Sequence, residues 1–347
     1  MRIGFFVNSI EAETATFTTT ALAFAAVGRG HDVCYVTPGD FVFRPDDSLF
    51  VRSHAVPSKR FRKAESLHAA LQSEAEAQVV DVGDIDVIFL RNDPSLDAAD
   101  RPWAANVGAM FGRLAAERGV IVVNDPDGLA RAQNKLYFQD FPRAVRPETL
   151  ISKSIEEIRT FIDAHPTGVI LKPLQGSGGK HVFKISSPEE ANLNQIFEAV
   201  SGEGYLIAQS YLPAASEGDI RLFLMNGRPL EKEGAYAAMR RVPAKGEVRS
   251  NIHARGKAAR VEITPEILEI AEMVRPKLIE DGMFLVGLDI VGDKILEINV
   301  FTPGGLTTMH ELYKVDFAVP VIEALERKVA HRSIYNGQIA NSILASL

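Results

Sequence analysis

The segment from Val169 to Phe183 constrains the fold of this chain more than any other stretch, because it reads as a strand, a glycine-rich turn and a second strand. Lys172 lies in the first strand. The turn itself contains Gly176, Ser177, Gly178 and Gly179. Glycine has no Cβ, so such a turn can bring several backbone N–H groups close to anionic oxygens, with the lysine charge beside them. The segment is typical of a flap over a polyphosphate, although the same residues could also form an ordinary tight hairpin.

Two common nucleotide-binding motifs do not fit this segment. The dinucleotide fingerprint and the Walker P-loop both run from a strand into a helix, whereas residues 181–185 favour a strand. No G-x-G-x-x-G follows the first strand of the chain, at residues 2–8. A nicotinamide or flavin dinucleotide is therefore not indicated.

Length and composition predict a soluble chain of two or three domains, since it has 347 residues. No apolar run approaches the roughly 18 residues needed to cross a bilayer, and the N-terminal apolar stretch lacks a signal-peptide pattern, so we expect a cytoplasmic protein without membrane contact. The net charge of -7 argues against nucleic-acid binding, and an anionic ligand would need locally clustered cations. The single cysteine, Cys34, lies in an apolar run and is expected to be a packed thiol.

Hydrophobic periodicity divides the chain into three blocks. In residues 1–125, two strand–helix–strand units predict a parallel sheet with helices on its faces. Residues 126–205 read as a small α+β lobe that contains the glycine turn. Residues 206–347 combine antiparallel segments, a helix over 265–280 and a final pair of strands.

The final pair of strands, residues 284–291 and 295–300, carries a second candidate site. If Asp289 lies opposite Glu297, one face of the pair is polar and the other is apolar. The polar face then holds Asp289, Glu297 and Asn299, and the apolar face holds Phe284, Val286, Leu288, Ile290, Leu296, Ile298 and Val300. This register needs a three-residue loop, which Gly292-Asp-Lys294 can supply together with a bulge.

Two neighbouring carboxylates repel each other unless protons or cations compensate. A small set of hard oxygen ligands suits Mg²⁺, which completes its shell with water and substrate phosphates. The same acids could instead lie on a solvated strand face without a metal. Their coexistence with a phosphate flap favours the metal.

Residues 240–260 form a third candidate region, with seven Lys or Arg and one Glu. Glycines and weak periodicity suit a loop that closes over an anionic substrate and excludes water, although a solvated basic surface has the same composition. Arg241 and Arg249 are our candidates for ligand contact.

Taken in chain order, these features resemble the bacterial glutathione synthetases, within the ATP-grasp ligases, over nearly the whole chain to about residue 330. The resemblance implies an ATP-grasp fold of α/β and α+β elements, preceded by an N-terminal parallel-sheet βαβ domain. The matching segments are 90–94, 122–126, 134–136, 170–174, 176–179, 208–213, 218–221, 286–290 and 296–300.

The resemblance also implies ATP and Mg²⁺ as cofactors, with two Mg²⁺ ions for which Mn²⁺ can substitute. The residues implied are Lys135, Lys172 and the turn 176–179 for the ATP phosphates, Gln209, Tyr211 and Leu212 for the adenine hinge, Asp219 for the ribose, and Asp289, Glu297 and Asn299 for the metal. A homo-oligomer is expected on the same ground.

In this family a substrate carboxylate attacks the γ-phosphate of ATP to give an acyl phosphate, and an amine then displaces phosphate to leave an amide, ADP and inorganic phosphate. Such chemistry needs positioning and charge neutralisation but no side-chain nucleophile. Arg221 and Arg241 are then the candidates for stabilising the transferring phosphoryl group or the acyl phosphate.

Departures from the family concern the substrate. Thr302-Pro-Gly-Gly-Leu306 stands where the bacterial synthetases typically carry Ser-Pro-Thr, and residues before Thr18 match poorly. The expected substrate contacts are Arg249, Asn251, Gly304 and Gly305, with His253 and Arg255 left open. Glutathione synthesis from γ-glutamylcysteine and glycine is the leading hypothesis. A ligase for other amino acids, peptides or metabolites, and a non-catalytic ATP-binding sensor, remain as alternatives.

Overall fold

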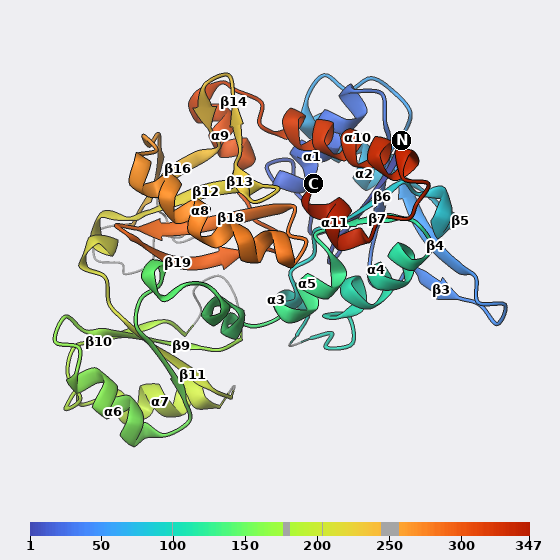
Figure 1. Ribbon diagram of the computed structural model, residues 1–347. Coiled ribbons are helices and arrows are strands. Elements are labelled where there is room, and N and C mark those ends of the chain that lie inside the picture. Colours follow the sequence, from blue (N-terminus) through green and yellow to red (C-terminus); the bar gives the residue numbers. More distant parts are fainter. Residues whose placement is uncertain (99, 176–180, 203, 244–256) are drawn as a thin grey trace.

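A computed structural model describes residues 1–98, 100–175, 181–202, 204–243 and 257–347. These described residues form three larger sheets of seven, four and six strands, together with a two-stranded ribbon. Figure 1 shows the four-stranded sheet below the six-stranded one, and the seven-stranded sheet beside them. No described helix is long and apolar enough to cross a membrane.

The seven-stranded sheet has the expected parallel centre, in the order β2-β1-β6-β7. These strands are apolar and almost entirely buried, as is typical of strands covered on both faces. The elements of this centre are β1 (Arg2–Phe6), α1 (Thr18–Gly28), β2 (Asp32–Val36), η1 (Val82–Asp84), β6 (Val87–Leu90), α3 (Pro94–Asp97), α4 (Val107–Glu117) and β7 (Ile121–Val123).

An antiparallel extension of this sheet was not predicted, so the expectation of a parallel sheet is correct only for the centre. Strand β4 pairs antiparallel with β2, β3 and β5. Five of the six residues of β5 are exposed, and so this strand shows no apolar alternation that would identify it in the sequence. The extension comprises β3 (Phe41–Phe43), β4 (Leu49–Ala55), α2 (Ala64–Glu74) and β5 (Glu76–Asp81).

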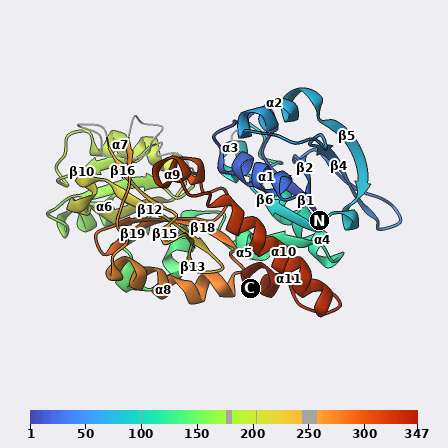
Figure 2. The same ribbon diagram turned by 90° about the horizontal axis from the view of Figure 1, so that it is seen from above.

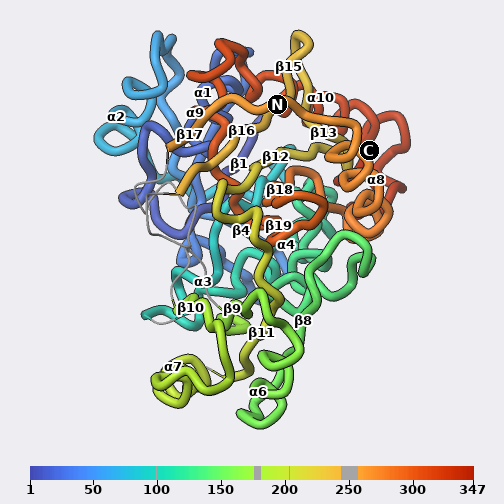
Figure 3. The backbone as a smooth tube through the Cα atoms, turned by 90° about the vertical axis from the view of Figure 1, so that its left-hand side faces the viewer, coloured from blue at the N-terminus to red at the C-terminus, as the bar shows by residue number. Residues whose placement is uncertain are grey.

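The small lobe is an antiparallel sheet in the order β10-β9-β11-β8, and it projects below the rest of the chain in Figure 3. Strand β11 completes this sheet, so the lobe extends past the expected boundary at 205 to Ser210. Apolar residues of helices α6 and α7 pack against the strands to form a separate core. The elements are β8 (Thr149–Ser152), α6 (Ile155–Asp163), β9 (Val169–Pro173), β10 (Phe183–Ile185), α7 (Leu193–Ser201) and β11 (Leu206–Ser210).

Short helical pieces connect the N-terminal sheet to this lobe. The chain forms an α-helix and then 3-10 turns, because Asn134 leaves the helical conformation and caps the second piece through its side chain. The pieces are α5 (Pro126–Arg131), η2 (Lys135–Asp140) and η3 (Arg143–Val145).

The six-stranded sheet runs β17-β16-β12-β18-β19, with β13 beside β12. Helix α8 has the bounds expected from the sequence, Pro265–Glu280. The remaining elements are η4 (Pro213–Glu217), β12 (Asp219–Met225), β13 (Arg228–Pro229), β14 (Glu231–Lys232), β15 (Ala235–Tyr236), β16 (Ala238–Val242), β17 (Lys257–Ala259), β18 (Leu285–Val291), β19 (Lys294–Asn299) and α9 (Leu306–Tyr313).

The register of the hairpin β18–β19 is the predicted one, with Asp289 opposite Glu297. The predicted three-residue loop is wrong, because Val291 pairs with Lys294 and the turn has two residues, with a bulge beyond Asp289. Lys294 and Ile295 therefore shift by one position relative to the prediction. Ile295 becomes a core residue, whereas Leu296 lines a cavity.

The last helices, α10 (Ala318–Ile334) and α11 (Asn341–Ser346), return to the N-terminal domain, as Figure 2 shows. Arg332 Nη2 lies 2.7 Å from Asp86 Oδ1, and the fully buried Lys328 donates to Asn226 Oδ1 at 2.9 Å and to the main-chain oxygen of Leu344 at 2.9 Å. The block expected over 206–347 is therefore shared between two parts of the molecule.

Candidate functional site

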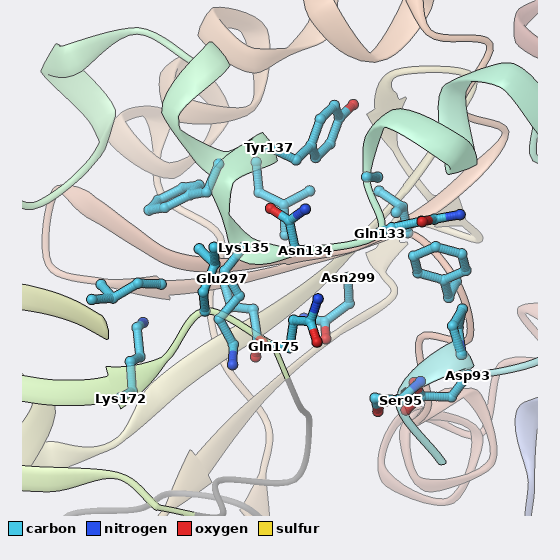
Figure 4. A pocket seen from close by; sticks show the side chains of 18 of the residues that line it. Asp93, Ser95, Gln133, Asn134, Lys135, Tyr137, Lys172, Gln175, Glu297 and Asn299 are labelled. Carbon is cyan, nitrogen blue, oxygen red and sulfur yellow. Dashed lines mark hydrogen bonds between the residues drawn. The ribbon is translucent and has the colours of Figure 1, made fainter. Parts of the chain in front are cut away.

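A cavity of about 170 Å³ lies where the small lobe faces the hairpin β18–β19. Lys172 of β9 and Gln209 of β11 line it from the small lobe, and Glu297 and Asn299 of β19 line it from the six-stranded sheet. Lys135, at the start of η2, lines it from a third direction. Figure 4 shows Lys135, Lys172, Glu297 and Asn299 around one space. The strand that carries Lys172 and the hairpin that carries Glu297 thus meet at one cavity.

Lys172 is half-buried, and its Nζ donates to Gln209 Oε1 at 2.9 Å. Alternation along β9 buries its neighbours Leu171 and Pro173 on the other face and turns the lysine toward the cavity. Burial lowers the pKa of the Lys172 ammonium to about 8, while the Glu297 carboxylate opposes the shift and Lys135 adds to it. Lys172 is therefore mostly charged at neutral pH but has little margin.

Lys135 is held against the same strand by its backbone and its side chain. Its N–H donates to Leu174 O at 3.1 Å, and its Nζ donates to Pro173 O at 3.1 Å. The preceding Asn134 caps η2 by accepting from Leu136 N at 2.9 Å. Two lysines at one cavity repel each other, which makes the cavity a favourable place for an anion.

The hairpin presents one carboxylate and one amide to the cavity. Glu297 is exposed. Asn299 donates through Nδ2 to Asp289 Oδ2 at 3.2 Å and to Gly287 O at 3.4 Å. This orientation points its amide oxygen away from Asp289. Both groups are hard oxygen donors of the kind that Mg²⁺ prefers.

Asp289 lies behind them as the centre of a buried ion-pair network. It is 3% exposed and accepts from Arg221 Nη2 at 2.8 Å and from Arg241 Nη2 at 2.8 Å. Arg241 also donates to the buried Asp219. Burial alone would raise the pKa of Asp289, but the two guanidinium groups outweigh it and hold that pKa below its ordinary value. Burial likewise opposes the charge of Arg241, and Asp289 and Asp219 overcome it and raise the pKa of Arg241.

This network joins the two predicted catalytic arginines to two predicted acids. Neither Asp289 nor Asp219 lines the cavity. Within the described ranges, no group of three or more His, Cys, Asp or Glu could hold a metal ion. Of the three predicted metal ligands, Glu297 and Asn299 line the cavity, and Asp289 lies behind them.

The other predicted residues either do not line the cavity or lie outside the described residues. Tyr211, which carries Lys184 Nζ at 3.5 Å over its ring, and Leu212 lie at the end of β11 outside the cavity lining. Gly304 O accepts from Arg221 Nη1 at 3.1 Å, and Gly305 has a φ of 124°. Outside the described residues lie Gly176, Ser177, Gly178, Gly179, Arg249, Asn251, His253 and Arg255.

Several polar residues of the cavity had no role assigned from the sequence. Asp93 and Ser95 reach it from the N-terminal domain, and Gln133, Asn134 and Gln175 from the connections of the small lobe. Asp93 and Asn134 lie in segments that carried the family resemblance, each just before a helical turn that its side chain caps. In the sequence, an Asp or Asn directly before a helical turn was the signal that could have identified these two residues.

Residues 1–130 match the family model "Prokaryotic glutathione synthetase, N-terminal domain", and residues 134–314 match "Prokaryotic glutathione synthetase, ATP-grasp domain". Glutathione synthetase of Bradyrhizobium diazoefficiens is 33% identical over 90% of this chain and 93% of its own length. Glutathione synthetase of Rhodopseudomonas palustris is 34% identical over 90% of this chain and 93% of its own length.

Solved structures of several ligases are similar in fold. D-cycloserine synthetase DcsG has a TM-score of 0.64 at 14% identity, covering 94% of this chain and 99% of that one. ATP-grasp ligase PsnB, complexed with a minimal precursor, Mg and ADP, has a TM-score of 0.59 at 16% identity, covering 94% of this chain and 98% of that one. D-alanine-D-alanine ligase of Coxiella burnetii has a TM-score of 0.58 at 11% identity, covering 97% of this chain and 98% of that one. The likeness at these identities concerns the ATP-grasp fold.

Proposed function

This chain belongs to the prokaryotic glutathione synthetase family and is an ATP-dependent ligase of the ATP-grasp fold, and from that premise we propose that it joins γ-glutamylcysteine to glycine. The observation that carries the proposal is the single cavity at which Lys135 and Lys172 face Glu297 and Asn299. Two cations on one side suit ATP phosphates, and two hard oxygen donors on the other suit the divalent ions that accompany them.

The residues present fit a nucleotide with magnesium. Lys135 and Lys172 hold the phosphates, and Gln209 fixes Lys172 from the side. Glu297 and Asn299 would hold Mg²⁺ or Mn²⁺ at the cavity, and Asp289, the third predicted ligand, lies behind them in ion pairs with Arg221 and Arg241. Bound ions neutralise phosphate charge during phosphoryl transfer. Gln209, Tyr211 and Leu212 receive the adenine, Asp219 the ribose, and the flap residues 176–179 the phosphates.

The reaction needs no protein nucleophile, because each bond that breaks is replaced by a bond between the reacting substrates. The cysteinyl carboxylate of γ-glutamylcysteine attacks the γ-phosphorus, the bond to the β-phosphate oxygen breaks, and ADP leaves. The glycine amine then attacks the acyl phosphate, loses a proton and expels phosphate. Arg221 and Arg241 balance the charge around the acyl phosphate, and Gly304, Gly305, Arg249 and Asn251 contact the substrates. Positioning and electrostatic stabilisation supply the rate.

The expected setting is a cytoplasmic homo-oligomer acting on small molecules. Light scattering coupled to size-exclusion chromatography measures the number of subunits. A monomeric mass would contradict this part of the proposal.

An ADP-release assay with Mg-ATP and a panel of acids and amines tests the function. We expect ADP release that requires both γ-glutamylcysteine and glycine, with glutathione detected by mass spectrometry. ADP release with a different pair would establish a ligase for other amino acids, peptides or metabolites. ATP binding without acceptor-dependent ADP release would establish the sensor alternative.

Replacing Glu297 with Ala tests the site itself. Turnover should fall roughly a thousandfold or more, because a positioned charge at the transferring phosphate is lost. The melting temperature should change little, because Glu297 is exposed and the packing lies on the opposite face of the hairpin. Glu272→Ala, which removes an exposed carboxylate from α8, is the matched control and should retain full activity.

A further inference from the structure

A buried asparagine of the N-terminal domain lies against the hairpin β18–β19. Asn124 directly follows β7, the last strand of the parallel centre, and is 1% exposed. The hairpin belongs to a different sheet, the six-stranded one. None of the roles assigned so far uses this residue. Asn124 therefore links the N-terminal domain to the strands that carry the candidate metal ligands.

The side chain of Asn124 makes four hydrogen bonds to main-chain groups of the hairpin and its immediate neighbours. Oδ1 accepts from Phe284 N at 2.7 Å and from Leu285 N at 2.9 Å. Nδ2 donates to Leu285 O at 3.2 Å and to Val300 O at 2.5 Å. A primary amide has two N–H donors and an acceptor oxygen with two lone pairs, so the whole hydrogen-bonding capacity of this side chain is used.

These bonds are made where the pairing of the two strands ends. The last pair of β18 with β19 at this end is Gly287 with Asn299, and both Leu285 and Val300 lie beyond it. On its other edge, β18 pairs with β12 as far as Leu285. A buried main-chain group without a partner costs free energy comparable to a lost hydrogen bond. The Asn124 amide therefore takes the place of a strand partner at the open end of the hairpin.

Val300 connects this contact to the ATP cavity. It directly follows Asn299, the last residue of β19, and both residues line the cavity. The next two residues, Phe301 and Thr302, line it as well. Because the chain is continuous, the direction in which it leaves β19 sets both the position of the Asn299 amide and the cavity wall beside it.

Burial makes the position of the hairpin end depend on this one side chain. Phe284 and Leu285 are fully buried, and Val300 is 3% exposed. Water is therefore a poor substitute for the amide at this place. A side chain without the amide would leave buried N–H and C=O groups that must find new partners, and the chain around Val300 would move to reach them.

We propose that Asn124 is a positioning residue for the ligase reaction, which holds the end of β19 so that Asn299 and Glu297 present their oxygens to the metal ions that accompany ATP. The inference rests on the proposed function, in which the hairpin holds these ions. Asn124 itself does not line the cavity, so it acts through the main chain of the hairpin. Removing a group that orients metal ligands from behind typically costs about 10- to 100-fold in metal affinity or activity.

Asn341 of α11 provides a matched control. Its Oδ1 accepts from Val122 N at 2.9 Å, and its Nδ2 donates to Val122 O at 2.9 Å and to Asp125 Oδ2 at 2.8 Å. These bonds attach α11 to β7, and none of them involves the hairpin. Asn341→Ala therefore removes a similar set of hydrogen bonds between two parts of the molecule without disturbing the end of β19.

Binding of Mn²⁺ to the enzyme–ADP complex, followed by the electron paramagnetic resonance of the free ion, measures the effect without turnover. For Asn124→Ala we expect the Kd of Mn²⁺ to rise about 10- to 100-fold, and for Asn341→Ala to stay within about twofold of the native value. In turnover, the Mg²⁺ concentration that gives half the maximal rate should rise by the same factor in Asn124→Ala, with kcat at saturating Mg²⁺ within about threefold of native. Asn124→Ser is measured beside it, because its hydroxyl can still bond one main-chain group and so spares more of the fold.

A Kd of Mn²⁺ that is unchanged in a folded Asn124 variant would overturn the inference. An equal rise in Asn341→Ala would also overturn it, because the cause would then be a general loosening between the domains. Failure of the proposed function looks different, since native enzyme would release no ADP with γ-glutamylcysteine and glycine. The comparison of Kd values needs only ADP and Mn²⁺, so it decides the role of Asn124 whichever acid and amine are joined.

Discussion

The two clusters of buried charge in this protein solve the same physical problem in opposite ways. Around Asp289, each carboxylate meets a guanidinium group at hydrogen-bond distance, and the pKa of Asp289 falls below its ordinary value. Around Glu13 and Arg91, buried polar atoms have no hydrogen-bond partner among the described residues, and the pKa of the carboxyl group rises. The first cluster compensates itself and can serve as a rigid support. The second carries a desolvation cost that is offset only in part.

The largest effect is expected on breaking the paired cluster. Asp289→Asn removes one charge without changing the shape of the side chain and leaves Arg221 and Arg241 with too little negative charge. Removing one partner of a buried ion pair typically costs about 3–5 kcal/mol. We therefore expect the free energy of unfolding to fall by about that amount at pH 7, as measured by urea denaturation.

The same variant has a defined dependence on pH. Because the pKa of Asp289 is lowered in the fold, its stabilisation is complete above its unfolded pKa of 3.8 and is lost as the pH falls below that value. The difference between the native protein and Asp289→Asn should therefore narrow in acid. An Asp289→Asn protein as stable as the native one at pH 7 would show that the network is not needed for the fold.

The unpaired cluster should respond with the opposite sign. Burial raises the pKa of Glu13 from 4.5 to about 7, so the native state binds more protons than the unfolded state between these values. Its contribution to stability is full below pH 4.5 and is lost as the pH rises through 7. One pKa unit corresponds to about 1.4 kcal/mol, so Glu13→Gln should be more stable than the native protein by about 3 kcal/mol at pH 8.

Thermal unfolding at pH 5 and pH 8 measures this difference. At pH 5 the two proteins should have nearly equal stability, because Glu13 is then neutral. Loss of stability in Glu13→Gln at both pH values would mean that the carboxylate supports the fold, and the contrast with Asp289 would disappear.

The register that places Asp289 opposite Glu297 was predictable from the sequence, and the reason is periodicity. Alternation along two short strands leaves one register in which Asp289 faces Glu297, and a slip of one residue would place Leu296 beside the acid. The same regularity fixed helix α8. The prediction failed where the register depends on the turn. A two-residue turn with a bulge replaced the expected three-residue loop, and it placed Ile295 in the core instead of Leu296.

The unpaired cluster could not be predicted, because nothing local distinguishes it. Glu13 lies in an irregular connection, and Arg91 stands in a segment whose resemblance to known proteins carried no role for it. They meet only because β1 and β6 are neighbours in the sheet. The contact of Arg91 with Pro303 joins residues more than two hundred positions apart. The ion pairs of Arg221 and Arg241 with Asp289 likewise required the strand neighbours of β12.

Lys172 is intermediate between the two clusters, since it is half-buried and has one neutral partner, Gln209. Its pKa of about 8 means that the free enzyme loses this charge as the pH rises through 8. Bound phosphate favours the charged lysine, so the Kd for ATP should be constant between pH 7 and 8 and rise up to about tenfold per pH unit above it. Isothermal titration with Mg-ATP measures this. Lys172→Arg should remove the dependence, and a Kd that stays flat to pH 9.5 in the native enzyme would contradict it.

The smallest effect is expected where charges are paired in water. Glu326 of α10 accepts from Arg29 Nη2 and Nε at 2.8 Å and lies 2.7 Å from His31 Nε2. This carboxylate, like Asp289, therefore has a guanidinium partner, and the pair connects the end of α1 to α10. Hydrogen bonds from Arg29 lower the pKa of Glu326 to about 2, but the side chain is 31% exposed and solvent screens it. Glu326→Gln should therefore cost only about 0.5–1 kcal/mol at low salt and less at 1 M NaCl. A cost near that of Asp289→Asn, unaffected by salt, would show that pairing and not burial determines the energy of both networks.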